Sequence, residues 1–197
     1  MLTIGVLGLQ GAYKKHSRLL NRLGVNSINV RYPNELDRCQ ALIIPGGEST
    51  TIMKLMDFIH IRDKIVKFSE SRPIFGTCAG MILMAKKAND PKLETLSLID
   101  MEVIRNAYGR QVDSFTHSID VMVNGNKETI SGVFIRAPRV LKVGKNVKVL
   151  ASLNGDPVFV REGIHLATTF HPELSSSTVV HQMLINLIKG PVYQSGA

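Results

Sequence analysis

The chain has 197 residues, 44% of them hydrophobic and 20% charged, a balance typical of globular proteins and unlike that of disordered ones. Its net charge of +8 is spread over many segments without a nucleic-acid-binding motif, so we expect no nucleic-acid binding and interpret the charge as a solvated basic surface matched to an acidic partner. No apolar run approaches the roughly 20 residues that span a bilayer, and two cysteines are too few for a disulfide framework, so we expect a cytoplasmic protein without membrane association.

The first half of the chain alternates short apolar runs with segments of helical period. Residues 1–9 are apolar but lack the basic lead-in and cleavage site of a signal peptide, and therefore indicate a first strand. The pattern predicts strands at residues 3–9, 27–31, 41–44 and 73–76, and helices from residue 11 to Gly24, from a Ser49 N-cap onward, through 59–68, and over 79–87. This alternation predicts an α/β fold, flavodoxin-like, with a mostly parallel central sheet flanked by helices.

After about residue 101 the pattern changes to strands. Phe115, Ile119 and Val121 lie among polar residues, and Asn124-Gly125-Asn126 predicts a tight turn. Further strands are predicted at 133–135, 147–152, 158–161 and 166–170, followed by a helix that residues 175–177 cap and that runs to residue 188. We expect these additional antiparallel strands to belong to a single domain spanning residues 1–197.

The segment 74–81 carries the strongest local signal for chemistry. A predicted strand runs into Gly76-Thr77-Cys78-Ala79-Gly80 and directly out into a helix, the sulfur counterpart of the turn that presents a nucleophilic serine. The start of the following helix favours a thiolate. We therefore predict that Cys78 is a nucleophile, whereas Cys39, beside the apolar run 41–44, is expected to be a half-buried structural thiol.

A nucleophile needs a base and a group that orients the base. His171 and Glu173 supply both at the end of a predicted strand, where residues two apart project to the same side. His-x-Glu alone is a weak motif, but together with the cysteine turn it indicates a Cys78–His171–Glu173 triad.

A third motif, Gly46-Gly47-Glu48-Ser49, follows the predicted strand at 41–44. Ligands of open α/β sheets bind at this carboxyl edge, and paired glycines leave backbone N–H groups accessible to a developing oxyanion. Taken alone, the segment also fits an ordinary turn before a helix.

The other histidines show no spacing typical of a metal site, so we expect no metal and interpret them as surface residues or supports of the site. They are His16, His60, His117, His165 and His181. Gly5, Gly8 and Gly11 miss the dinucleotide fingerprint, which argues against a nicotinamide cofactor.

Seven segments together carry a resemblance to a known family. Residues 45–49, 76–80 and 170–173 resemble class I (triad) glutamine amidotransferases, and residues 8–13, 46–51, 105–115 and 134–139 are similar to the glutaminase subunits of pyridoxal 5′-phosphate synthases. These motifs span nearly the whole chain, and Arg-Asn-Ala-Tyr-Gly-Arg-Gln at the start of segment 105–115 is far more specific than the cysteine turn.

The resemblance implies a role for each matching residue and no cofactor. Cys78 would attack the side-chain amide of L-glutamine, His171 and Glu173 would complete the triad, and the N–H groups of Gly47 and Ala79 would bind the oxyanion. The positions implied to hold glutamine are Gly46, Gly47, Glu48, Arg105, Ile135 and Arg136.

The resemblance also implies a partner, the synthase subunit that condenses ammonia with ribose 5-phosphate and glyceraldehyde 3-phosphate. Gln10 matches a family residue at that interface which helps to set the oxyanion hole, so the isolated chain is expected to have weak activity. Lys15 and Thr116-His117 stand where the family often has acidic residues, which affects the details of the interface but not the triad.

Two alternative functions remain open from the sequence. One is a glutaminase for another synthase, of imidazole glycerol phosphate or of purine precursors, which the segment 105–115 disfavours. The other is a non-catalytic flavodoxin-like protein with a reactive cysteine, which would not need His171 and Glu173 together with Gly46-Gly47.

Overall fold

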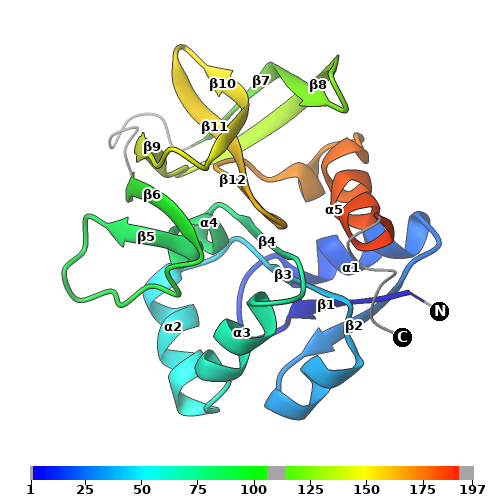
Figure 1. Cartoon of the computed structure of the whole chain (residues 1–197), viewed down its shortest axis with the longest axis vertical. Helices are drawn as coiled ribbons and strands as arrows, with labels where there is room; N and C mark the ends of the chain where they lie inside the picture. Colours follow the sequence, from blue (N-terminus) through cyan, green and yellow to red (C-terminus); the bar gives the residue numbers. More distant parts are fainter. Residues whose placement is uncertain (1, 106–113, 191–197) are drawn as a thin grey trace.

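A twisted seven-stranded sheet forms the centre of the molecule (Figure 1), and the computed structural model describes residues 2–105 and 114–190. Its strand order is β10-β11-β12-β4-β3-β1-β2. The parallel strands are β1 (Thr3–Leu7), β2 (Asn26–Val30), β3 (Ala41–Ile44), β4 (Ile74–Thr77) and β12 (His165–Thr168), and β10 (Lys148–Leu153) and β11 (Asp156–Glu162) extend the sheet antiparallel. The predicted α/β fold is confirmed.

Helices cover both faces of this sheet because its inner strands are apolar on both sides. On one face, Ile4 and Ile43 belong to the same buried cluster as Leu20 of α1 (Tyr13–Arg22) and Leu184 of α5 (Val179–Lys189). The opposite face packs against α2 (Ser49–Phe58), α3 (Arg62–Ser69) and α4 (Ala79–Met84). None of the helices in the described part of the chain has the length and apolar character needed to cross a bilayer.

The second half of the chain adds two small sheets. One contains β5 (Ala85–Ala88), β6 (Ile99–Ile104) and β9 (Arg139–Val143), and the other is a long hairpin of β7 (Ser114–Val123) and β8 (Asn126–Ile135). Strands β5 and β6 lie at the left and β7 and β8 at the top of Figure 1. The hairpin turns at Asn124 and Gly125, with φ of 49° and 85°, as a tight turn of this type requires. The predicted turn is confirmed.

Two predicted helical stretches are shorter or more broken than expected. The helix predicted over 79–87 ends at Met84, because residues 85–88 pair with β6 instead of continuing the helix. The segment 59–68 does not continue α2, because His60 adopts φ of 55° and α3 begins at Arg62. In both places two elements are separated by a break, and the spacing of the apolar residues does not reveal it.

Both predicted helix caps were wrong by one to three residues. Glu48, not Ser49, caps α2, because its longer carboxylate accepts from the N–H groups of Thr50 and Thr51. Thr178 occupies the N-cap of α5, although the Ser177 hydroxyl oxygen does accept from the Val179 N–H. Short polar residues cluster at both helix starts, so composition alone does not select the capping one.

Two further expectations need correction. The strand predicted at 166–170 ends at Thr168, which places His171 outside the sheet. Cys39 is completely buried and not half-buried, with its Sγ 3.4 Å from the carbonyl oxygen of Glu35. Of the segment 105–115, residues 106–113 lie outside the described residues.

Candidate active site

The order β12-β4-β3-β1 places four loops side by side at the carboxyl edge of the sheet. These loops carry His171, Cys78, Gly46-Gly47 and Gln10, which follow the four strands in that order. Parallel strands present their carboxyl ends at the same edge. Residues separated by up to 161 positions in the chain therefore meet because of the strand order.

Cys78 occupies the turn between β4 and α4 and has a strained backbone, with φ of 49° and ψ of −105°. The turn is tight because glycines flank it: a Cβ on Gly76 would meet the backbone of Gly80, and one on Gly80 would overlap the carbonyl oxygen of Ile44. The Cys78 N–H donates to the Thr168 carbonyl, and Sγ lies 3.7 Å from the Ile135 carbonyl oxygen. The predicted strand–cysteine–helix turn is thus present.

His171 lies between Cys78 and Glu173. Its Nδ1 is 2.7 Å from Glu173 Oε1, and Cys78, which lines the same pocket, is near enough to interact electrostatically with its ring. The contact forms for a different reason from the one predicted, since the two residues flank Pro172 in the 3₁₀ turn η2 (Pro172–Leu174) and not in a strand. Pro172 begins that turn, where its missing N–H costs nothing.

The electrostatics of this pair favour two charged groups. Burial favours a neutral His171 ring, but its interactions with Cys78 and Glu173 outweigh burial and raise the pKa of His171 to about 10. Burial likewise opposes ionisation of Glu173, but the imidazoles of His16 and His171 lower the pKa of this carboxyl to about 2. An imidazolium held by a carboxylate next to a cysteine is an arrangement suited to nucleophilic catalysis.

The Gly46-Gly47 loop lies directly against this pair. A Cβ on Gly46 would overlap the His171 ring, and one on Gly47 would overlap the side chain of Gln10. Gln10 Oε1 accepts from the Glu48 N–H at 2.9 Å, and the Gly46 carbonyl accepts from the Ala12 N–H at 3.0 Å. The loop after β1 thus holds the loop after β3.

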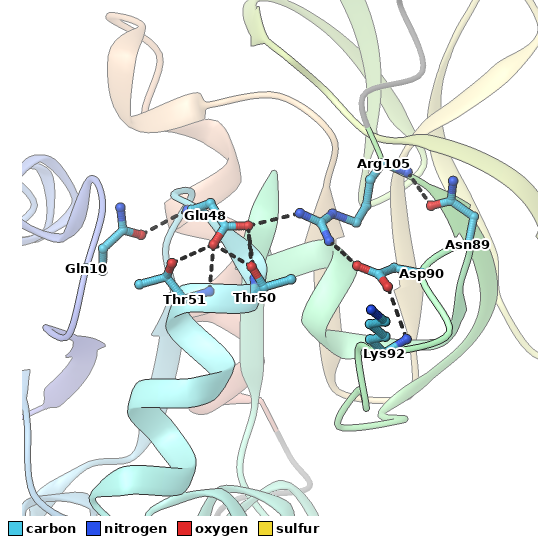
Figure 2. A network of polar contacts seen from close by, with 8 residues as sticks. All are labelled: Gln10, Glu48, Thr50, Thr51, Asn89, Asp90, Lys92 and Arg105. Atoms are coloured by element: carbon cyan, nitrogen blue, oxygen red, sulfur yellow. Dashed lines mark hydrogen bonds and ion pairs between the residues drawn. The ribbon is translucent and has the colours of Figure 1, made fainter.

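Glu48 is the centre of a polar network (Figure 2). Its carboxylate accepts from the hydroxyl and N–H groups of Thr50 and Thr51 and lies 2.9 Å from the Arg105 guanidinium, which also meets Asp90 at 2.6 Å. Burial opposes ionisation of Glu48, but the hydrogen bonds from Thr50 and Thr51 together outweigh it and lower the pKa of this carboxyl to about 2. A carboxylate and a guanidinium therefore lie side by side at the pocket.

One pocket unites these groups. It is lined by Gln10, Gly11, Ala12, Gly46, Gly47, Glu48, Ser49, Cys78, Ala79, Ile82, Arg105, Ile135, Arg136 and His171. Every predicted site residue is in this set except Glu173, which lies behind His171. Among residues 2–105 and 114–190, no group of three or more His, Cys, Asp and Glu side chains is arranged to hold a metal ion.

Sequence reasoning gave no individual role to the residues behind and beside the triad, and interpreted His16 and His181 only as surface residues or supports of the site. His16 and His181 are completely buried next to Glu173, Thr77 contacts His16, and Asp90 pairs with Arg105. The two histidines had a detectable signal, because each occupies the inward stripe of an amphipathic helix, three and four residues before buried aliphatic residues. His60 and His117, in contrast, are exposed.

Comparison with known proteins agrees with this geometry. The model of the SNO glutamine amidotransferase family matches residues 6–189. The chain is 45% identical over 189 residues to a pyridoxal 5′-phosphate synthase subunit PdxT from Thermosipho africanus and 46% identical to one from Desulforudis audaxviator, covering 95% of this chain and 100% of each relative.

Solved structures point in the same direction. A crystal structure of a glutamine amidotransferase superimposes with a TM-score of 0.89 at 43% identity, covering 95% of this chain and 99% of the other. The structure of PurLQS from Thermotoga maritima shares the fold with a TM-score of 0.72 at 18% identity, covering 95% and 99% of the two chains.

Proposed function

The chain belongs to the SNO glutamine amidotransferase family and is the glutaminase subunit of a pyridoxal 5′-phosphate synthase, and from this premise we propose that Cys78, His171 and Glu173 are its catalytic triad. The observation that carries the proposal is the 2.7 Å contact of His171 Nδ1 with Glu173 Oε1, made by a ring that lines the same pocket as Cys78. Conversion of L-glutamine to L-glutamate and ammonia is the reaction that this arrangement supports best.

The reaction proceeds through a thioester on Cys78. The thiolate attacks the side-chain carbonyl carbon of glutamine, and the resulting tetrahedral intermediate collapses as the His171 imidazolium donates its proton to the departing amine, which releases ammonia. The ring, now neutral, takes a proton from water as the water attacks the thioester. Collapse of this second tetrahedral intermediate releases glutamate and restores the Cys78 thiolate beside the His171 imidazolium. Glu173 holds the ring orientation and stabilises the imidazolium in both steps.

The oxyanion of each tetrahedral intermediate is bound by the backbone N–H groups of Gly47 and Ala79. The two residues lie in the loop after β3 and at the start of α4, and both line the pocket that contains Cys78. Such preoriented donors stabilise the charge that develops in the transition state. Removal of one donor typically raises the activation free energy by about 3 kcal/mol.

Glutamine is bound by Gly46, Gly47, Glu48, Arg105, Ile135 and Arg136. Its ammonium and carboxylate ends are complementary to a carboxylate and a guanidinium, and Glu48 and Arg105 present these groups side by side in the pocket. The Ile135 carbonyl oxygen lies 3.7 Å from the Cys78 sulfur, so the end of β8 closes the side of the pocket nearest the nucleophile.

The partner is the synthase subunit that uses the ammonia. Free ammonia is protonated in water and ceases to be a nucleophile. Direct transfer of ammonia to the partner, which combines it with ribose 5-phosphate and glyceraldehyde 3-phosphate, avoids this loss. Gln10 is the interface residue: because its side chain accepts from the Glu48 N–H, a partner that contacts Gln10 acts on the loop that holds Gly47. The chain functions as one domain over residues 1–197, in the cytoplasm, without nucleic acid, membrane, metal or cofactor.

Replacement of the nucleophile tests the proposal directly. With the synthase subunit present, Cys78→Ala is expected to lower glutamate release at least about 1000-fold, and the electrophile diazo-oxo-norleucine should label Cys78 of the parent protein in a reaction that glutamine blocks. Cys39→Ala is the matched control, since this buried thiol lies outside the pocket, and it should keep both activity and labelling.

The isolated subunit provides a second measurement. Its glutaminase rate should be well below the rate with the synthase, because the partner is needed to set the oxyanion loop. Retained activity of Cys78→Ala would overturn the assigned nucleophile, and full turnover by the isolated chain would overturn the proposed role of the partner.

A further inference from the structure

Two histidines form a completely buried pair directly behind the proposed triad. His16 comes from α1 and His181 from α5, and His16 Nδ1 lies 2.9 Å from His181 Nε2. Both rings meet the edge or face of Phe75 at nearly 90°, with ring centroids 6.3 and 5.8 Å away. Buried imidazoles are costly unless their nitrogens are hydrogen-bonded, so this pair requires an explanation.

The other nitrogen of His16 faces the triad. His16 Nε2 is 3.4 Å from Glu173 Oε2 and 3.3 Å from the Thr77 hydroxyl oxygen. Glu173 Oε2 is buried and has no hydrogen bond among the described residues, whereas Oε1 is occupied by His171. The ring of His16 is thus placed against the one carboxylate oxygen that His171 leaves unsatisfied.

These distances select one arrangement of protons. An unprotonated Nε2 would direct its lone pair at a carboxylate oxygen, so Nε2 must carry the hydrogen. Burial lowers the pKa of His16, which keeps the ring neutral, and Nδ1 is therefore an acceptor. Burial also lowers the pKa of His181, to about 3, and this neutral ring donates from Nε2 to His16.

Thr77 extends the contact to the oxyanion loop. Its hydroxyl oxygen accepts from the Gly46 N–H at 3.0 Å as well as from His16, and Thr77 directly precedes Cys78 in the chain. His16 therefore contacts, through one N–H, both the carboxylate that orients His171 and the hydroxyl that fixes the start of the Gly46-Gly47 loop.

We infer that His16, backed by His181, is a positioning residue of the glutaminase reaction that holds Glu173 and, through Thr77, ties the triad to the oxyanion loop. The inference rests on the proposed roles of Cys78, His171 and Glu173. It extends the three-residue triad to a buried chain of five side chains that runs from the pocket to the contact between α1 and α5.

Kinetics with the synthase subunit test the inference. His16→Leu should lower kcat about 10- to 100-fold with little change in KM, the size of effect usual when a residue behind a reacting group is removed. His16→Gln, whose amide can reach the position of Nε2, should recover much of the loss. If His16 only filled space, the amide donor of His16→Gln would not restore kcat.

The pH profile provides a readout that packing alone would not change. The titratable groups facing His16 in the described structure are Glu173 and His171 after β12 and His181 on α5. Without the His16 donor, Glu173 is easier to protonate, so the acid limb of kcat/KM should move to higher pH. His165→Leu is the matched control: it removes a partly buried imidazole at the opposite end of β12 that accepts from the Ile74 N–H, and it should leave the acid limb in place.

A measurement on the isolated chain separates this inference from the proposed function. Long-range ¹H–¹⁵N spectra of histidine-labelled protein should show His16 and His181 as neutral rings protonated at Nε2. A ring of His16 protonated at Nδ1, or folded His16→Leu protein with unchanged kcat and acid limb, would overturn the inference. Activity of Cys78→Ala would instead overturn the triad, and the ring assignments do not depend on that result. If His16→Leu does not fold, the kinetics of His16→Gln and the histidine spectra still test the inference.

Discussion

At the scale of single residues, the site depends on glycines that let reactive groups approach the backbone. Gly46 faces the His171 ring, Gly47 faces Gln10, and Gly80 faces the Ile44 carbonyl oxygen, each too closely to leave room for a Cβ. Cys78 has a strained backbone, which places its side chain at the sheet edge. Such strain persists only where the surrounding structure stabilises it. The reactive side chains are thus placed by residues that have no side chain.

Gly46→Ala tests this dependence. The added Cβ would overlap the His171 ring, so the ring must move away from Cys78, and a displacement of about 1 Å is enough to lower kcat about 100-fold. Glutamate release with the synthase subunit measures the loss.

The control is Gly190→Ala at the end of α5, where φ is −70° and a Cβ would make only ordinary contacts. This variant should keep its activity. A Gly46→Ala protein with parental kcat would show that the ring does not depend on this contact.

At the scale of elements, several structures serve both the fold and the pocket. The N-cap of α2 is Glu48, whose carboxylate accepts from the first N–H groups of the helix and also pairs with Arg105. The long β7–β8 hairpin stacks Phe115 on Phe134 with ring centroids 4.7 Å apart and ends at Ile135 beside Cys78. A change at either element is therefore expected to affect both the stability of the fold and the shape of the pocket.

Two substitutions separate the roles of Glu48. Glu48→Gln keeps an oxygen for the cap but loses the charge, so the free energy of unfolding should change by less than about 1 kcal/mol, while KM for glutamine rises roughly 10- to 100-fold on loss of a charge-assisted bond. Denaturant unfolding and steady-state kinetics measure the two effects.

Glu48→Ala should raise KM similarly and also destabilise the protein by about 1 kcal/mol, because the cap is lost. Thr51→Val is the control, since it removes one hydroxyl bond to the carboxylate and leaves the charge. An unchanged KM in Glu48→Gln would exclude Glu48 from substrate binding.

At the scale of the whole molecule, the triad is backed by the helices α1 and α5 on one face of the sheet. Glu173 lies at the point where α1, β4 and the segment before α5 meet, and its side chain is completely buried. Because the carboxyl has a pKa of about 2 in the folded protein and near 4.3 in an unfolded chain, its ionisation is coupled to global unfolding.

This coupling predicts a pH dependence. A lowered folded pKa adds stability that is fully present above about pH 4.3 and is lost as the pH falls toward 2. The difference in unfolding free energy between the parent protein and Glu173→Gln should therefore grow from pH 2 to about 4.5, by an amount on the order of 3 kcal/mol, and then level off.

Urea unfolding across this pH range measures the difference, and subtraction of the two proteins removes the contribution of all other carboxyls. Asp120→Asn is the control, because Asp120 is exposed on the hairpin and its substitution should give a small difference. A difference that does not vary with pH would contradict an ionised, buried Glu173.

Local signals in the sequence determined the kind of fold and the main chemical groups. The alternation of apolar runs and helical periods, the cysteine turn at 76–80 and the Asn124-Gly125 turn depend on neighbouring residues alone, and so they could be predicted along with the family. The tertiary structure decided where helices stop and which side chains meet: α4 ends because residues 85–88 pair with β6, and His171 contacts Glu173 through a 3₁₀ turn. His16 reaches Thr77 and His181 across 61 and 165 residues. Contacts of this range depend on strand order and packing, which no local pattern contains.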